Sequence, residues 1–316
     1  MGKYNNKYCK ELAKRIFMGD LSEASYYPKY FTIETTNNCN ASCIMCPKGQ
    51  RGTKSLQLMS NALFDKIVEE IKAYNNWIEM ICLNSDGEPL LDREIAVKIK
   101  KLKDIGIKHV NISTNGALLS QEKIGELLDS GLDDIRISID GYTEETYEKV
   151  RLGLSYRVVK ENVLGLIRMR NETKNNMEIR IRMVELDENI GERDDWLRYW
   201  KSQVKENDRV QIMPMHTWSG EIAEEDKTRI EYYSDKPCVS VFSSCTINYD
   251  GIVQLCDSDI AQQQVMGDVN YQTIQEIWQS EKFETIREWH ANAKRNNIAI
   301  CQGCDHWSRE FKEQVI

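Results

Sequence analysis

Long apolar runs are absent from this chain of 316 residues. No stretch approaches the roughly 18–20 consecutive apolar residues that a helix needs to cross a bilayer. The basic segment from Met1 to Gly19 also lacks the continuous apolar centre of a secretory signal peptide, and its amphipathic pattern predicts a helix packed on the protein. These absences predict a cytoplasmic protein that does not bind a membrane.

A basic stripe is also missing. The net charge is −8, and acidic and basic residues are mixed along the chain, so the electrostatic footprint of a nucleic-acid-binding protein is absent. The sequence contains neither an internal repeat nor a low-complexity tract. Because 41% of the residues are apolar, the chain can bury a large core, and we expect one large domain with a smaller one beside it.

Cysteine, in contrast, is plentiful, with ten residues in the chain. A reducing cytoplasm disfavours structural disulfides, so clustered cysteines indicate metal or redox chemistry. Only Cys9 and Cys82 stand apart from two groups. The first group is Cys39, Cys43 and Cys46, and the second is Cys238, Cys245, Cys256, Cys301 and Cys304.

Short apolar runs alternate with helical periodicity over the first two thirds of the chain. Such alternation predicts a parallel sheet with right-handed crossovers, and six units are too few for a full eight-fold barrel. We therefore expect a partial (β/α)6 barrel that binds its ligands at the carboxyl ends of the strands. The expected strands are Phe31–Thr35, Met80–Asn84, Lys108–Ser113, Asp134–Ile139, Glu178–Val184 and Arg209–Met213. The expected helices are Asn61–Ala73, Arg93–Ile105, Ser120–Ser130, Thr143–Val150, Val158–Arg170 and Asp194–Lys205.

The pattern changes near Gly220, where the charged segment Glu221–Lys236 has weak periodicity. Beyond it, Asp250-Gly251 lies between two apolar runs, Ser244–Ile247 and Ile252–Leu255, and predicts a β-hairpin. A single helix is expected over Ile274–Ala291. We predict a helical extension over residues 1–30, a barrel core over 31–220 and a small α+β domain over 221–316.

The first cysteine group directly follows the first expected strand. Thiolates are soft ligands that suit both iron–sulfur clusters and zinc, but a structural zinc site usually takes four protein ligands. The spacing Cys39-x3-Cys43-x2-Cys46 resembles the cluster motif of the radical S-adenosylmethionine (SAM) superfamily, although Met45 stands where that family usually has an aromatic residue. The resemblance implies a [4Fe–4S] cluster with one open iron that binds SAM and cleaves it to a 5′-deoxyadenosyl radical. A zinc knuckle is the alternative.

Further segments resemble motifs of this family and follow in the same order. Asp86-Gly87-Glu88 resembles the family's Gly-Gly-Glu segment, which receives the SAM amino group, with Asp86 in place of the first glycine. Polar residues end the third and fourth expected strands, where the SAM ribose and carboxylate are expected, and an arginine follows in a context similar to that of the family's SAM-carboxylate arginine. These residues are Ser113, Asn115, Ser138, Asp140 and Arg151.

The second cysteine group resembles the SPASM/twitch domains of radical SAM enzymes. The resemblance implies an auxiliary [4Fe–4S] cluster held by Cys238, Cys256, Cys301 and Cys304. A four-cysteine zinc site is the alternative that the spacing leaves open. The segments Val265–Val269 and Ile274–Trp278 resemble in particular the dehydrogenase type that acts on 2-deoxy-scyllo-inosamine.

These resemblances predict an oxidoreductase that abstracts hydrogen from a small polyol, sugar or aminocyclitol and oxidises a carbinol to a ketone. The alternatives are an epimerase in which Cys245, or less favourably Cys82, donates hydrogen, and a peptide-modifying maturase. His216 is a candidate proton acceptor, and Arg182 and Glu185 are candidate substrate contacts. The expected partners are a small-molecule substrate and an electron donor such as flavodoxin or ferredoxin.

Overall fold

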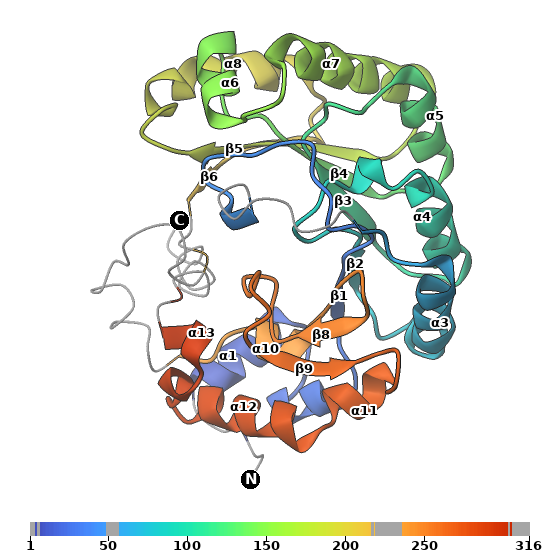
Figure 1. Cartoon of the computed structure of the whole chain (residues 1–316), viewed down its shortest axis with the longest axis vertical. Coiled ribbons are helices and arrows are strands. Elements are labelled where there is room, and N and C mark those ends of the chain that lie inside the picture. The colour runs from blue at the N-terminus through green and yellow to red at the C-terminus, as the bar shows by residue number, and fades with distance from the viewer. Residues whose placement is uncertain are drawn as a thin grey trace.

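The computed structural model describes residues 4, 7–48, 57–215, 218, 236–302 and 304. Nine strands form one sheet in the order β6-β5-β4-β3-β2-β1-β7-β8-β9. The first six strands are parallel and curve into an open arc with helices on the outside (Figure 1). This arrangement confirms the partial barrel. The strands are β1 (Tyr30–Ile33), β2 (Met80–Cys82), β3 (Val110–Thr114), β4 (Asp134–Ser138), β5 (Glu178–Glu185), β6 (Arg209–Pro214), β7 (Ser244–Ile247), β8 (Ile252–Gln254) and β9 (Val265–Asp268).

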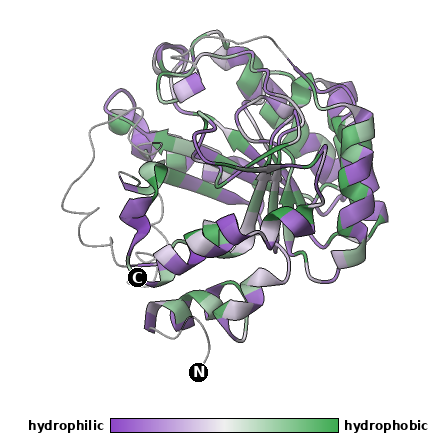
Figure 2. Cartoon of the chain, turned by 60° about the horizontal axis from the view of Figure 1, so that its bottom comes forward, coloured by the Kyte–Doolittle hydropathy of each residue, from purple (hydrophilic) through white to green (hydrophobic). Residues whose placement is uncertain are grey.

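Three of the helices that cover the arc begin at hydroxyl side chains. Ser60, Ser120 and Thr143 each accept a hydrogen bond from a backbone N–H in the first turn of the helix that follows. Each longer helix presents an apolar stripe to the sheet and polar side chains to the outside, which Figure 2 shows as alternating green and purple segments. The helices over the arc are α3 (Asn61–Ile71), α4 (Ile95–Asp104), α5 (Gln121–Asp129), α6 (Glu144–Val150), α7 (Tyr156–Glu172) and α8 (Arg193–Gln203).

The C-terminal part extends the barrel sheet instead of forming a separate one. Strand β7 pairs in parallel with β1, so that Tyr30 lies opposite Ser244, and β8 and β9 continue the sheet antiparallel to β7 and to each other. The predicted hairpin is confirmed, whereas the sequence analysis did not predict β9. Helices on the outer side of this part are α10 (Ser240–Ser243), α11 (Ile274–Trp278), α12 (Glu281–Ala291) and α13 (Ala299–Gln302).

The prediction of one helix over Ile274–Ala291 is wrong, because the segment forms two helices. Ser280 accepts a hydrogen bond from Phe283 N and starts α12 in a new direction. The predicted boundary at residues 220 and 221 lies outside the described residues, so the domain limits remain a prediction.

The amphipathic N-terminal segment forms α1 (Lys7–Arg15), which buries Cys9, Leu12 and Ala13. It lies beside the C-terminal helices at the open side of the arc (Figure 1). The turn Leu21–Ser25, which follows α1, is bound to α11 because Trp278 Nε1 donates to the carbonyl oxygen of Ala24 at 2.6 Å. Among the described helices, none has the length and apolar character needed to cross a bilayer.

Candidate active site

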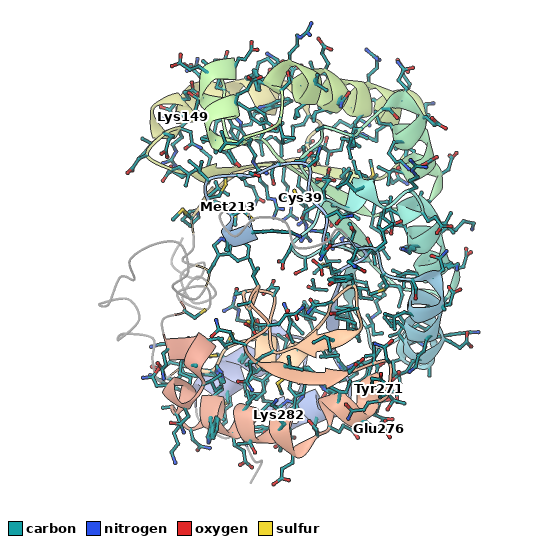
Figure 3. The ribbon with its side chains drawn as sticks, in the orientation of Figure 1. Cys39, Lys149, Met213, Tyr271, Glu276 and Lys282 are labelled. Atoms are coloured by element: carbon teal, nitrogen blue, oxygen red, sulfur yellow. The ribbon has the colours of Figure 1, made fainter. Side chains whose placement is uncertain are left out.

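A cavity of about 690 Å³ occupies the inside of the arc. It is lined by the loop that carries Cys39, Cys43 and Cys46, by strands β1 to β5, and by residues from α1 and the C-terminal part. Figure 3 shows Cys39 on the inner side of the arc, whereas Glu276 lies on its outer rim. The cavity therefore gathers segments that are more than 200 residues apart in the sequence, including Arg15 and Asp257.

The loop of the first cysteine group is held by backbone hydrogen bonds to the end of α6. Ser42 N donates to Leu152 O at 2.9 Å, and Ile44 N donates to Val150 O at 3.1 Å. Cys39 lies within electrostatic range of Cys43 and Cys46. Burial raises the pKa of Cys39 to about 11, so this thiol favours the neutral form until a metal draws off its proton.

The loop after β2 packs directly against the chain that leads into this cysteine loop. Glu88 N donates to Asn38 O at 2.6 Å. A Cβ at Gly87 would lie 2.1 Å from Thr36 O and 2.8 Å from Asn38 O, so only glycine fits. This approach explains why the second position of the Asp86-Gly87-Glu88 segment is a glycine.

Glu88 joins the ends of β2 and β3. Its carboxylate accepts hydrogen bonds from the Thr114 hydroxyl at 2.6 Å and from Asn115 N at 2.7 Å. Burial raises its pKa. The Asn115 amide in turn donates to Asn40 Oδ1 at 2.7 Å, which ties β3 to the cysteine loop. Both predicted SAM contacts line the cavity and also hold its rim together.

Asp86 is paired with a second acid that the sequence analysis missed. Asp86 N donates to Glu34 Oε1 at 3.2 Å, and Glu34 is almost fully buried at the end of β1. Burial, and then the charge of Asp86, raise the pKa of Glu34 to about 8. Glu34 therefore holds a proton near neutral pH.

Arg151 and Asp140 form a buried ion pair, with Nε 2.5 Å from Oδ2. The other carboxylate oxygen of Asp140 accepts from Val184 N at 2.7 Å, so this predicted SAM contact anchors β5 and does not line the cavity. Arg151 does line it, as do Ser113 and Ser138 at the ends of β3 and β4.

The second cysteine group lies behind the wall of this cavity. Cys256 is within electrostatic range of Cys238, Cys301 and Cys304, and burial raises its pKa well above the usual value. Its neighbour Asp257 lines the cavity itself. The structure therefore brings together the four cysteines that the SPASM resemblance implies.

Two further residues hold this group and were missed by the sequence analysis. His290 accepts a hydrogen bond from Cys238 N at 3.3 Å, and its Nε2 lies 3.7 Å from Cys301 Sγ. Burial, and then Arg295, lower the pKa of His290 to about 3, so it stays neutral. Arg295 donates to Cys301 O at 2.6 Å. Only their closeness in sequence to Cys301 could have drawn attention to them.

Cys245 is not in the cavity. It is buried on the opposite face of β7, while its neighbour Ser244 lines the cavity, because successive side chains of a strand point to opposite faces. Cys82 does line the cavity. His216 lies outside the described residues. Of the two candidate substrate contacts on β5, Arg182 lines the cavity, whereas Glu185 pairs with Arg193 at 3.1 Å.

The donor sets suit iron–sulfur clusters. Three thiols on one loop leave a cluster site open to a chelating molecule, and four thiols close the other set. In the described part of the chain, no three His, Cys, Asp or Glu side chains gather closely enough for a single metal ion. A four-iron cluster separates its thiolates more widely than one tetrahedral ion does, so such a cluster is compatible with the arrangement found.

Comparison with known proteins agrees with both sites. Residues 33–181 match the family model of the radical SAM superfamily, and residues 238–305 match the SPASM iron–sulfur cluster-binding domain. A probable GTP 3′,8-cyclase from Methanococcus maripaludis is 33% identical over 133 residues, which is 42% of this chain and 43% of that protein. One from Metallosphaera sedula is 29% identical over 170 residues, 50% of this chain and 51% of that protein. The chain thus spans about half the length of these curated relatives.

Solved structures share the fold over most of the chain. The structure of BtrN in complex with AdoMet and 2-DOIA superposes on this chain with a TM-score of 0.61 and 18% sequence identity, and the match covers 88% of this chain and 93% of BtrN. The structure of Streptococcus suis SuiB bound to precursor peptide SuiA superposes with a TM-score of 0.67 and 14% sequence identity, and the match covers 98% of this chain and 79% of SuiB. The two family matches, the barrel and the two cysteine sets agree: the chain belongs to the radical SAM superfamily and carries a C-terminal SPASM domain, which implies SAM and an auxiliary iron–sulfur cluster.

Proposed function

We propose that this radical SAM enzyme oxidises a carbinol of a small polyol or sugar-like substrate to a ketone. The observation that carries the proposal is the position of Asp257. This carboxylate lines the same cavity as the first cysteine group and is directly adjacent to Cys256 of the second. A proton acceptor thus lies beside the auxiliary cysteine set, within reach of a substrate in the cavity.

The two cofactor sites follow from the thiols described above. Cys39, Cys43 and Cys46 would hold the SAM-binding cluster, with the loop at Glu88 and the serines of β3 and β4 around SAM. When bound, these groups supply a 5′-deoxyadenosyl radical that abstracts hydrogen, and the auxiliary cluster supplies an electron acceptor. The auxiliary ligands would be Cys238, Cys256, Cys301 and Cys304.

Conversion of a carbinol to a ketone removes one hydrogen atom, one proton and one electron from the substrate. We assign the proton to Asp257, because it lines the cavity next to the auxiliary cysteines. His216 stays a second candidate for this role from the sequence alone. An external donor such as flavodoxin or ferredoxin would deliver the reducing electron to the SAM-binding cluster.

The test is the mass and isotope content of the product. Oxidation yields a ketone two mass units lighter than the substrate, with no solvent hydrogen at the reacting carbon. Asp257→Asn should keep SAM binding and lose most of the ketone, since general base catalysis contributes roughly 10²–10⁴-fold. A product of unchanged mass, or full ketone formation by Asp257→Asn, would refute the assignment.

Epimerisation is the second candidate, and the position of Cys82 favours it. Its thiol lines the cavity, and Sγ donates to Asn84 Oδ1 at 3.3 Å. Burial raises the pKa of Cys82, so it remains a protonated thiol that can donate a hydrogen atom. This candidate predicts one deuterium in the product in heavy water, lost in Cys82→Ser. Cys245, which the sequence favoured as the donor, does not fit this role because it lies behind β7.

We further propose a small-molecule substrate instead of a peptide. A cavity of about 690 Å³ must accommodate SAM together with the substrate, which favours a compact molecule. The matched structures include BtrN, which is shown with 2-DOIA, and SuiB, which is shown with a precursor peptide, so a peptide-modifying maturase remains the rival. SAM cleavage that is stimulated by peptides but by no sugar or polyol would favour that rival.

A further inference from the structure

The inner surface of the barrel carries two arginines beside the predicted SAM contacts on β3 and β4. Arg136 on β4 precedes the cavity-lining Ser138 by two residues, so it lies on the same face and about 6–7 Å deeper along the strand. Arg182 on β5 lies opposite Ser138 in the sheet register, and its Nη2 donates to Ser113 Oγ at 3.0 Å. Both arginines line the cavity, and we call this pair the arginine floor.

Negative charge near the arginine floor is scarce. The carboxylate of Asp134 contacts Arg136 Nε at 3.1 Å, but the same carboxylate also contacts the side chains of His109 and Arg180. Arg182 forms no ion pair with the described residues, and its Nε is buried without a hydrogen-bond partner among them. One carboxylate therefore faces several cationic groups.

The two arginines also repel each other. Burial, and then the charge of Arg136, lower the pKa of Arg182 to about 10, so that it remains charged at neutral pH. A buried guanidinium with an unused N–H costs free energy until a partner satisfies it. Carboxylates and phosphates match the planar donor fork of arginine.

Other acids of the cavity do not meet this need. Glu88 is engaged by Thr114 and Asn115, and Asp86, on the loop after β2, donates from its backbone N–H to Glu34. Asp257 also lines the cavity, but among the described residues it forms no ion pair with either arginine. The SAM carboxylate has its own expected partner in Arg151, which is already neutralised by Asp140. The unused donor capacity thus lies on the arginine floor.

We propose that the arginine floor is an anion subsite and that the substrate carries a phosphate or carboxylate group bound by Arg182 and Arg136. The proposal rests on the proposed function in so far as it takes the cavity to be the substrate pocket. It narrows the substrate class to an anionic sugar or polyol and disfavours an aminocyclitol, because a cationic amine would be repelled by the two guanidinium groups.

The experiment measures equilibrium binding of radiolabelled inorganic phosphate to the reconstituted holoenzyme at saturating SAM. We expect one phosphate per chain. Arg182→Gln should weaken phosphate binding about 10- to 100-fold, the range for a lost charged hydrogen bond, and should weaken SAM binding much less, while iron content stays unchanged. Arg182→Lys, which keeps the charge, should lose less. Arg168→Gln on the exposed side of α7 is the matched control and should bind phosphate as the wild type does.

Three results would overturn the proposal: no phosphate binding by the wild type at saturating SAM, displacement of phosphate by SAM, or equal binding by Arg182→Gln and the wild type. If Arg182→Gln does not fold, the wild-type measurement and Arg182→Lys decide the question. The reaction type is measured separately. A ketone formed from a neutral polyol without phosphate binding would leave the proposed oxidation intact and remove the subsite. Phosphate binding together with an epimerised product would support the subsite and refute the proposed oxidation.

Discussion

Gly87→Ala is expected to disturb SAM binding through one methyl group. The new Cβ would lie 2.1 Å from Thr36 O and 2.8 Å from Asn38 O, both of them backbone atoms. Since a carbon and an oxygen in van der Waals contact are more than about 3 Å apart, the two segments in contact must separate by roughly 1 Å. One segment contains Thr36 and Asn38 and leads into Cys39. The other is the loop after β2, which carries Gly87 and Glu88.

The cost of this movement can be bounded. Overpacking of a well-packed site costs about 1–3 kcal/mol. Separation of the two loops also breaks the 2.6 Å hydrogen bond from Glu88 N to Asn38 O, worth about 0.5–1.5 kcal/mol. A total of about 2–4 kcal/mol is below the roughly 5–15 kcal/mol that holds a typical domain together, so the variant should fold. The SAM site, which lies between the two loops, should suffer more than the global fold.

The assay compares SAM affinity, iron content and thermal unfolding of anaerobically reconstituted protein. Gly125→Ala is the matched control, because a Cβ there meets no atom within 4 Å and lies inside α5, where alanine is the better helix former. We expect Gly87→Ala to bind SAM at least tenfold more weakly and Gly125→Ala to be unchanged or slightly stabilised. SAM affinity and unfolding temperature equal to the wild type in Gly87→Ala would refute the packing argument.

The cysteine sets and Glu34 allow three more tests. Replacing the first cysteine group with alanine should remove half of about eight irons and all 5′-deoxyadenosine formation after reduction with dithionite, and residual SAM cleavage would contradict its role; the group is Cys39, Cys43 and Cys46. Cys238→Ala should reduce product formation more than SAM binding, and zinc at that site in an anaerobic, iron-replete preparation would contradict the cluster. Because the folded state holds a proton on Glu34 up to a pKa of about 8, against an ordinary pKa of 4.5 for a glutamate, folding stability should fall as pH rises between these values. Glu34→Gln should therefore flatten the fall in unfolding temperature between about pH 6 and pH 8, and an unchanged slope would exclude Glu34 as its source.

The barrel was predictable from sequence because its elements are defined locally. Each expected strand of the barrel overlaps an observed one, and the polar residues at strand ends follow from the parallel arrangement. The two cysteine sets could also be predicted from the sequence, because the spacing of ligands along the chain is a local property. Helices α11 and α12 were merged because the apolar periodicity continues across Ser280, and only the cap geometry separates them.

Residues brought in by long-range pairing escaped the sequence analysis. Arg15 reaches the cavity because α1 packs at the open side of the arc, and Tyr249 N contacts Glu34 because β7 pairs with β1. The choice between Cys245 and Cys82 depended on which face of each strand points inward. Register sets that face, and a shift of one residue reverses it, so spacing alone could not decide.

The directions of β7 and β8 determine how the two cysteine sets are arranged. Strand β7 runs parallel to β1, and β8 returns antiparallel, with Gln254 opposite Thr246. Continuing this register places Cys256 near the level of Ser244, which lies opposite Tyr30 at the start of β1. Cys39, in contrast, follows the end of β1.

Cysteines at the two ends of the same strand are separated by the length of that strand. With a rise of about 3.3 Å per residue, the two sets lie on the order of 10–15 Å apart along β1. The cavity spans this length, since both Cys39 and Asp257 line it. Within the arginine floor, Arg182 lies level with Ser138, and Arg136 lies two residues below it, toward the Asp257 end. A substrate held there by its anionic group would turn the C–H of its carbinol toward the SAM side and the O–H of the same carbinol toward Asp257, so hydrogen-atom loss and proton loss would occur at neighbouring atoms of one carbinol.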